Sequence, residues 1–241
     1  MWTIFFRKLN NSIDIYLSQE HWLFDCQLNL LSEIHQQYTG VGKAVHSNDP
    51  ITPLRMPRGY GGTAILWRKD IDTIVTPLTI GNNRIQCIEI TGDPNLLIIS
   101  VYLPCKGSPN SQNEFQECID QLHEIMSTYE QTHQVIIGGD FNEEITNINT
   151  TTRQQYVVEF MAEHQMYTKE MGPTFINAKG KDCTSIDYIL FQESYRDQIS
   201  SIKKIDVIAN VSDHYPILLT LKYKKPIDKN QKYAHTQKTK I

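Results

Sequence analysis

The sequence predicts an α/β fold in which two β-sheets pack face to face as a sandwich flanked by helices. Short runs of β-branched and apolar residues, typical of strands, occur in groups along the chain. Three segments with helical periodicity are placed between these groups, and such an order favours a layered sandwich. A length of 241 residues suits one large domain of this class.

The first elements lead from a strand to a long loop. Residues 13–18 alternate weakly between apolar and polar side chains and predict a strand that ends at Glu20. Leu28, Leu31 and Ile34 recur at helical spacing, which predicts a helix over residues 26–37. Residues 40–62 contain five glycines and three prolines, and we interpret them as a surface loop with a strand at its start.

The remaining elements alternate between strands and two helices. Helical periodicity predicts helices over residues 111–129 and 152–165. Gly92-Asp93 is a hairpin turn between two of the strands. The predicted strands cover residues 63–67, 74–79, 84–90, 95–103, 134–140, 174–176, 184–191, 203–209 and 215–223.

One stretch combines a buried strand with polar side chains at its end. The strand runs into Gly138-Gly139, where the backbone can approach a ligand closely or bend sharply. If the extended conformation continues, Asp140 and Asn142 point the same way and could hold a water and a phosphate or metal. The alternative is a turn in which Asp and Asn make local backbone hydrogen bonds.

The charge is unevenly distributed along the chain. Seven lysines and one aspartate give residues 222–241 a net charge of +6, so residues 1–221 carry −10 of the total of −4. A body this acidic does not attract nucleic acid globally, and a phosphate partner would have to be held locally by a metal and a few basic loops. We expect a domain over residues 1–223 and a solvated Lys-rich tail or linker over residues 224–241.

The sequence also bears on the compartment. No apolar run approaches the ~20 residues of a membrane span, and residues 1–11 lack the features of a signal peptide. Five cysteines form no CxxC pair, which favours free thiols in a reducing environment. We therefore expect an intracellular protein, nuclear or cytoplasmic, that is not secreted and has no membrane partner.

Four polar clusters lie where predicted strands run into loops. Each alone has a structural explanation: a lone Glu is commonly solvated surface, a lone Asp is commonly a turn residue, and an Asp-His pair is commonly a cap. The clusters are Glu20, Asp140 with Asn142, Asp187, and Asp213 with His214.

Together, these clusters belong to motifs that occur in a fixed order. They are QE at 19–20, YLP at 102–104, GGDFN at 138–142, IDYIL at 186–190 and SDHYPI at 212–217. In this order they resemble the endonuclease/exonuclease/phosphatase superfamily of metal-dependent phosphoesterases. LSQEHWL (17–23) and GYGGTAILW (59–67) are most similar to the apurinic-type endonuclease domain of non-LTR retrotransposons. The resemblance covers residues 13–223 and implies a DNase I-like four-layer sandwich.

The resemblance implies a role for each acidic residue around a divalent cation. Glu20 would be the metal ligand and Asp213 would assist it. The cation would be Mg²⁺, with Mn²⁺ possible, since a hard cation needs only one or two carboxylates and keeps several waters. Asp140 would orient or deprotonate the attacking water, and Asn142 would fix the same site by hydrogen bonding.

The resemblance also implies contacts to the substrate. His214 would contact the scissile phosphate, with Asp187 holding its tautomer and orientation. Tyr102 would place its phenol against a phosphate oxygen. Further substrate contacts are expected from Ser185, Arg58 and Lys181.

The implied activity is Mg²⁺-dependent cleavage of a DNA phosphodiester that leaves a 3′-hydroxyl for retrotransposition. In an intact element, a reverse-transcriptase region would lie downstream. However, the chain has no WNxxG segment before Glu20, so the family's first strand and helix are expected to be missing, as in an N-terminally truncated copy. The alternatives are an inositol-phosphate or phospholipid phosphatase of the same superfamily, and an inactive truncated relic.

Overall fold

The computed structural model describes residues 13–44, 61–107, 110–146, 151–206, 210, 212–224 and 237–240. Residues 1–12, which precede the first predicted strand, lie outside them. The strands are β1 (Ile15–Gln19), β2 (Tyr38–Lys43), β3 (Thr63–Arg68), β4 (Val75–Leu78), β5 (Ile85–Ile90), β6 (Asn95–Tyr102), β7 (His133–Asp140), β8 (Met166–Tyr167), β9 (Asp187–Gln192), β10 (Ile199–Lys204), β11 (Ile217–Tyr223) and β12 (Gln237–Lys240). The α-helices are α2 (Ser111–Tyr129) and α3 (Thr152–Glu163), and the 3₁₀ helices are η1 (Asp25–Ser32), η2 (Lys69–Ile74) and η3 (Glu193–Gln198).

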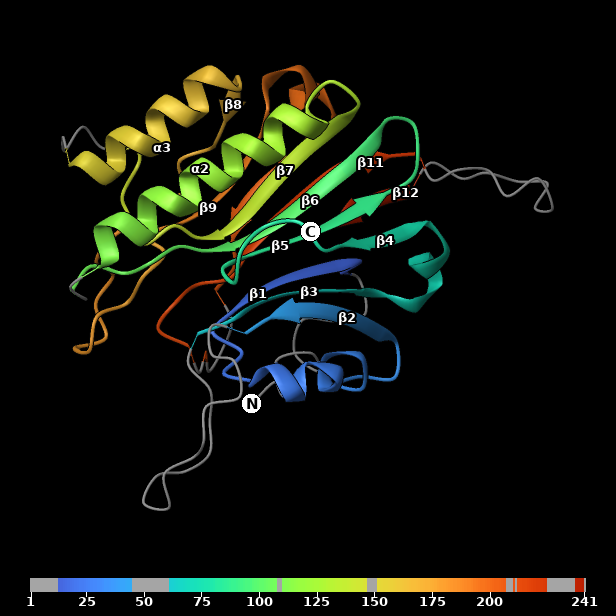
Figure 1. Ribbon diagram of the computed structural model, residues 1–241, viewed down its shortest axis with the longest axis horizontal. Helices are drawn as coiled ribbons and strands as arrows, with labels where there is room; N and C mark the ends of the chain where they lie inside the picture. The colour runs from blue at the N-terminus through green and yellow to red at the C-terminus, as the bar shows by residue number, and fades with distance from the viewer. Residues whose placement is uncertain are drawn as a thin grey trace, which may run out of the picture.

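The strands form two packed layers, which confirms the predicted sandwich (Figure 1). One layer is a six-stranded sheet in the order β4-β5-β6-β7-β9-β8. The other contains two three-stranded sheets, β1-β3-β2 and β10-β11-β12. Helices α2 and α3 cover the outer face of the large sheet, and η1 packs on β2 and β3 on the opposite side.

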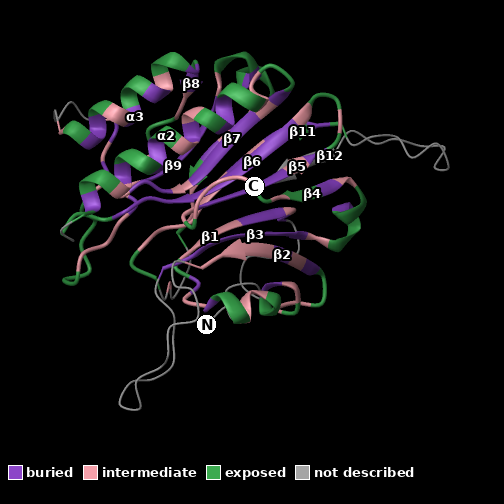
Figure 2. Ribbon diagram, in the orientation of Figure 1, coloured by how far each residue is buried: buried purple, intermediate pink, exposed green. Residues whose placement is uncertain are grey.

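The central strand β6 shows why these layers form. Leu97 and Ile99 pack into the apolar cluster beneath α2 and α3, whereas Leu96 and Ile98 pack between the two layers of sheet. Successive side chains of a strand point to opposite faces, so a strand buried on both faces is a continuous apolar run. Figure 2 shows the large sheet as mostly buried, with exposed residues along the outer faces of both helices.

Several predicted elements differ in the structure. The helix predicted over residues 26–37 is the shorter η1, in which only Leu31 is fully buried, and so narrow a stripe does not require a full α-helix. The strand predicted over residues 174–176 is reduced to isolated bridges from Phe175 and Ile176. β10 begins earlier than the strand predicted over residues 203–209, of which residues 207–209 lie outside the described part of the chain.

The end of the chain departs from the prediction of a linker. Residues 237–240 form β12, which pairs antiparallel with residues 220–223 of β11. An edge strand gains backbone hydrogen bonds without an apolar pattern, and lysines are common on edges, so composition alone did not reveal it. The domain boundary at residue 223 stays a prediction. No helix among the described residues is long and apolar enough to cross a membrane.

Gly139 is required where β7 passes β6. Its φ is +145°, and a Cβ there would lie 2.0 Å from the Val101 carbonyl oxygen. We expect Gly139→Ala to lower the free energy of unfolding by about 2–4 kcal/mol, measured by urea denaturation. Gly172→Ala is the control, because Gly172 also has a positive φ but has open space around it. An equal loss in both variants would show that the contact with Val101 is unimportant.

Candidate active site

The strand pairing brings four of the predicted side chains to one edge of the large sheet. β6 and β7 are parallel, and Tyr102 is paired with Asp140 at their carboxyl ends. The antiparallel β9 begins at the same edge, where Asp187 is paired with Asp140. His214 reaches this edge from the segment before β11, through a bridge to Phe175. The register therefore explains why residues far apart in sequence meet.

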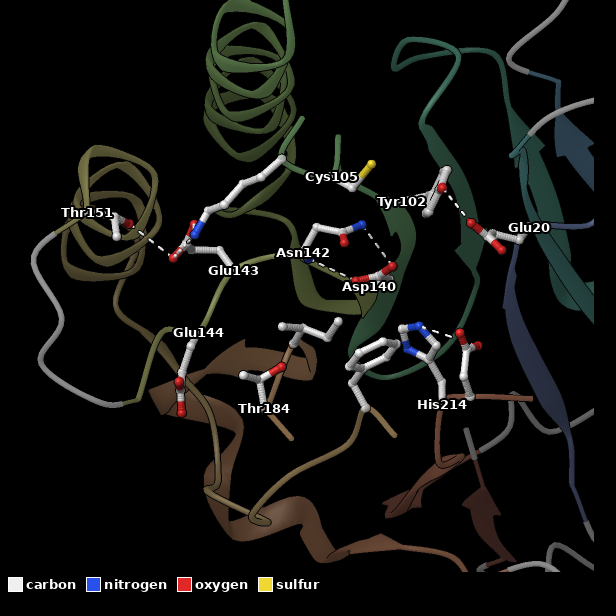
Figure 3. A pocket seen from close by; sticks show the side chains of 14 residues that line it. Glu20, Tyr102, Cys105, Asp140, Asn142, Glu143, Glu144, Thr151, Thr184 and His214 are labelled. Carbon is white, nitrogen blue, oxygen red and sulfur yellow. Dashed lines mark hydrogen bonds and ion pairs between the residues drawn. The ribbon is translucent and has the colours of Figure 1, made fainter. Parts of the chain in front are cut away.

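A pocket of about 540 Å³ opens at this edge. Figure 3 shows Tyr102 beside Glu20 on one side of it, Asp140 beside Asn142 at its centre, and His214 below them. The predicted residues that line the pocket are Glu20, Tyr102, Asp140, Asn142, Asp213 and His214.

Asp140 and Asn142 meet through a turn, which corrects the prediction of a continued strand. β7 ends at Asp140, and Asn142 has a φ of +50°. The backbone N–H of Asn142 donates to Asp140 Oδ1 at 2.8 Å, and its side-chain Nδ2 donates to Asp140 Oδ2 at 2.9 Å. The local turn and the functional arrangement are thus the same structure, since the turn itself orients the carboxylate.

His214 and Asp187 form a close pair. His214 Nδ1 lies 2.9 Å and 3.0 Å from the two carboxylate oxygens of Asp187, so Nδ1 carries a proton and donates it. Burial disfavours the imidazolium, but the hydrogen bond and charge of Asp187, with the charges of Asp140 and Asp213, raise the pKa of His214 to about 9. At neutral pH the ring is therefore a half-buried cation whose Nδ1 is fixed.

The environment of Asp140 favours its neutral, protonated form. Burial, followed by the negative charge of Asp187, raises the pKa of Asp140 to about 7. His214 and the hydrogen bond from Asn142 lower this pKa, and Glu20 raises it. A carboxyl group that titrates near neutral pH can accept a proton from water and release it again.

Glu20 lies across the pocket from this group, at the end of β1. The hydroxyl of Tyr102 donates to Glu20 Oε1 at 2.6 Å. The guanidinium of Arg84 lies over the Tyr102 ring, 5.3 Å from its centroid. The structure therefore gives Tyr102 a role in orienting Glu20, and its contact to a phosphate oxygen stays a prediction.

Of the three residues expected to bind substrate, the two that the structure describes do not line the pocket. Ser185 is only 4% exposed, whereas its neighbours Thr184 and Ile186 line the pocket. Lys181 is exposed in a turn whose backbone N–H donates to the Asn177 side chain. Arg58 lies outside the described residues.

The pocket has a second half that sequence reasoning missed. Glu143 is 4% exposed, and its Oε1 accepts hydrogen bonds from Lys106 and Thr151. The side-chain nitrogen of Lys106 is also 2.8 Å from Oε2. The available signal was position, because Glu143 follows GGDFN directly and Lys106 lies two residues after YLP.

The donor set at the pocket fits a hard divalent cation. Glu20 and Asp140 offer oxygen atoms, and burial, followed by the negative charge of Asp187, raises the pKa of Asp140. Mg²⁺ prefers such oxygens and retains several waters, so it does not require a closed protein cage.

Another group of potential metal ligands lies at the far end of α2 and α3. His123 Nδ1 and His164 Nε2 are 2.8 Å apart, and Glu163 lies 3.6 Å from His123. Glu130 accepts a hydrogen bond from His164 Nδ1 at 2.7 Å. This hydrogen-bonded chain accounts for the cluster without an ion.

The sandwich gathers carboxylates, a carboxamide and an imidazole–carboxylate pair at one strand edge, as the phosphoesterase motifs predict. The chain belongs to the endonuclease-reverse transcriptase family, whose sequence profile matches residues 96–218. This places it in the endonuclease/exonuclease/phosphatase superfamily, as the motifs predicted, and makes it a nuclease-type hydrolase at the level of the family. No curated protein sequence matches the chain.

Solved structures share the fold. The 3′ phosphatase NExo from Neisseria, bound to a product DNA hairpin, is 15% identical with a TM-score of 0.66, over 92% of this chain and 93% of that one. The endonuclease domain of TRAS1, a telomere-specific non-LTR retrotransposon, is 17% identical with a TM-score of 0.62, over 85% and 83%. The AP endonuclease LMAP from Leishmania major is 14% identical with a TM-score of 0.65, over 85% and 77%.

Proposed function

We propose that the chain is a Mg²⁺-dependent DNA endonuclease that nicks one strand and leaves a 3′-hydroxyl. The observation that carries this proposal is that one pocket contains both a carboxylate that can act as a base and an imidazolium that can donate to a phosphate. Asp140, with a pKa of about 7, is available as a base, while His214, with a pKa of about 9, is available as a cation. The solved structures with this fold include AP endonucleases and a DNA-bound 3′ phosphatase, which supports a DNA substrate.

Asp140 acts on the attacking water. Its carboxylate accepts a proton from the water, whose oxygen then forms the new bond to phosphorus. The bond from phosphorus to the 3′ oxygen breaks, and that oxygen takes a proton from solvent. Asn142 holds both oxygens of Asp140 through its backbone and side-chain nitrogens, so the base is oriented before substrate binds.

His214 acts on the phosphate. Its imidazolium would lie against a phosphoryl oxygen and offset the negative charge that increases during attack. Asp187 holds Nδ1–H of the ring, which leaves Nε2 as the nitrogen available to donate to the phosphate. Fixed donors of this kind act strongly in a site that is partly shielded from water.

Glu20 would hold the divalent cation, assisted by Asp213, which also lines the pocket. Mg²⁺, or Mn²⁺ in its place, supplies Lewis-acid polarisation of the phosphoryl oxygens when bound. The 3′-hydroxyl produced by nicking would prime reverse transcription by a downstream region of an intact element. That partner and a nuclear or cytoplasmic location are part of the same proposal.

The deciding experiment incubates the chain with supercoiled plasmid and Mg²⁺, with Mn²⁺, and with EDTA. Nicked circles that a DNA polymerase can extend without phosphatase treatment are expected in the first two reactions only. Inositol phosphates are tested in parallel. Intact plasmid together with released inorganic phosphate would replace the endonuclease with a phosphatase, and no turnover of either substrate would favour an inactive relic.

Tyr102→Phe is expected to weaken the reaction without abolishing it. The variant loses the hydroxyl that donates to Glu20 Oε1 at 2.6 Å, a bond to a charged group worth about 1.5–3 kcal/mol. Nicking at a fixed low Mg²⁺ concentration should fall by roughly 10–100-fold. Tyr215→Phe, which removes a hydroxyl bonded to Asp182 on the surface, is the matched control and should nick normally. An unchanged rate in Tyr102→Phe would remove this hydroxyl from the mechanism.

A further inference from the structure

The turn that carries Glu20 contains a buried imidazole ring. Glu20 and Trp22 both have positive φ angles, 55° and 58°, a conformation that costs a non-glycine residue roughly 1–2 kcal/mol. His21 lies between them and is only 5% exposed. Such backbone conformations persist only where surrounding contacts hold them, so the contacts of this turn determine where the Glu20 side chain points.

Two hydrogen bonds fix the tautomer of His21. The backbone N–H of Leu23 donates to Nδ1 at 3.0 Å, so Nδ1 carries no proton. Nε2 therefore carries the proton and donates to the backbone carbonyl of Lys43 at 3.1 Å. The first bond closes the turn on itself, and the second ties the turn to the end of β2.

The ring also lies directly on Gly62, next to the start of β3. A Cβ at position 62 would lie 2.3 Å from ring atom Cε1, so only glycine permits this approach. The backbone N–H of Glu20 donates to the Gly62 carbonyl at 2.8 Å, and that of Trp22 donates to the Gly61 carbonyl at 2.9 Å. The imidazole and these two bonds together hold the left-handed turn against the Gly61-Gly62 segment.

We infer that His21 is a positioning residue for Glu20: it holds the turn that directs the Glu20 carboxylate into the pocket beside Tyr102. This inference rests on the proposed function, in which Glu20 holds the divalent cation. His21 is not among the residues that line the pocket, so it acts through Glu20. Loss of a side chain that orients a metal ligand costs roughly 10–100-fold in metal affinity or activity.

The test separates cation binding from turnover. In His21→Ala, the Mg²⁺ concentration that gives half-maximal nicking should rise by about tenfold or more, while the rate at saturating Mg²⁺ changes less. Mn²⁺ binding in the absence of DNA, followed by electron paramagnetic resonance, should weaken by the same factor. The second readout does not depend on catalysis.

Two further variants divide the contacts of the ring. His21→Asn keeps an acceptor near the place of Nδ1, and His21→Gln keeps a donor near the place of Nε2. Each should bind Mn²⁺ with an affinity between those of the wild type and His21→Ala. If His21→Ala does not fold, these two decide the matter, and wild-type Mn²⁺ affinity in both would overturn the inference.

His133→Ala is the matched control. His133 is also buried, at 9% exposure, and its Nδ1 is hydrogen-bonded to the Thr132 hydroxyl, but it lies at the start of β7, at the opposite end of that strand from Asp140. Its loss should lower the unfolding temperature and leave Mn²⁺ affinity unchanged. If His21→Ala behaves in the same way, the inference is overturned and the proposed function stands. If the wild type neither nicks DNA nor binds Mn²⁺, both are overturned.

Discussion

His214→Ala is expected to lower the rate of plasmid nicking by about 10²–10⁴-fold, the range typical of a positioned acid–base group. The variant removes a cation that the structure keeps protonated at neutral pH, with a pKa of about 9. It also removes the Nε2 donor that the proposed mechanism directs at the phosphate. Single-turnover nicking at saturating Mg²⁺ measures the effect, because product release then does not limit the rate.

The neighbouring carboxylate provides a sharper test of how His214 works. Asp187→Asn keeps the shape of the partner but removes the charge that raises the pKa of His214. The alkaline limb of the pH–rate profile should therefore move to lower pH, since the ring loses its proton sooner. His35→Ala, at a half-buried histidine whose Nδ1 accepts a hydrogen bond from the backbone N–H of Gln37 and which does not line the pocket, should nick as the wild type does. An unmoved alkaline limb in Asp187→Asn would contradict the role given to the pair.

The sequence predicted this pair for a reason that has a clear limit. Asp187 and His214 each lie within a recognisable motif, IDYIL and SDHYPI, but the register of β7 with β9 and the bridge at Phe175 are what bring them together. The periodicity of a short segment does not predict which distant segment it pairs with. Strands buried on both faces, such as β6, were easy to predict because they are continuous apolar runs.

The sequence-based predictions were wrong or incomplete at positions where the direction of a side chain depends on the conformation of the surrounding loop. Ser185, just before the IDYIL motif, is predicted to contact the substrate, but its side chain is only 4% exposed and does not line the pocket. The sequence does not distinguish Glu143 from an exposed loop glutamate, because its burial depends on contacts with Lys106 and Thr151, which are distant in sequence. The turn at Asn142 was weighed as an alternative to a functional site, whereas the structure makes the turn part of that site.

Asp140→Asn should abolish the base and lower nicking by about 10²–10⁴-fold, and it should also change how stability depends on pH. In the folded protein the pKa of Asp140 is raised from 3.8 to about 7, so the folded state binds this proton more tightly than the unfolded chain does. The stability that this proton contributes is complete below pH 4 and is lost as the pH rises through 7. The asparagine variant cannot lose it.

The unfolding temperature of the variant relative to the wild type should therefore increase from pH 5 to pH 8 in EDTA, and each ~1 kcal/mol should appear as about 2–4 °C. Asp72→Asn is the control, because Asp72 accepts a hydrogen bond from the Trp67 indole outside the pocket. Its difference from the wild type should not grow over that range. A parallel pH dependence in wild type and Asp140→Asn would contradict the raised pKa.

Added Mg²⁺ should stabilise the wild type at pH 8 more than the variant, since only the wild type presents the extra negative charge that a cation can balance. If the Asp140 carboxylate lowers stability without a cation and Mg²⁺ restores that stability, the residue serves cation binding and catalysis rather than packing of the core.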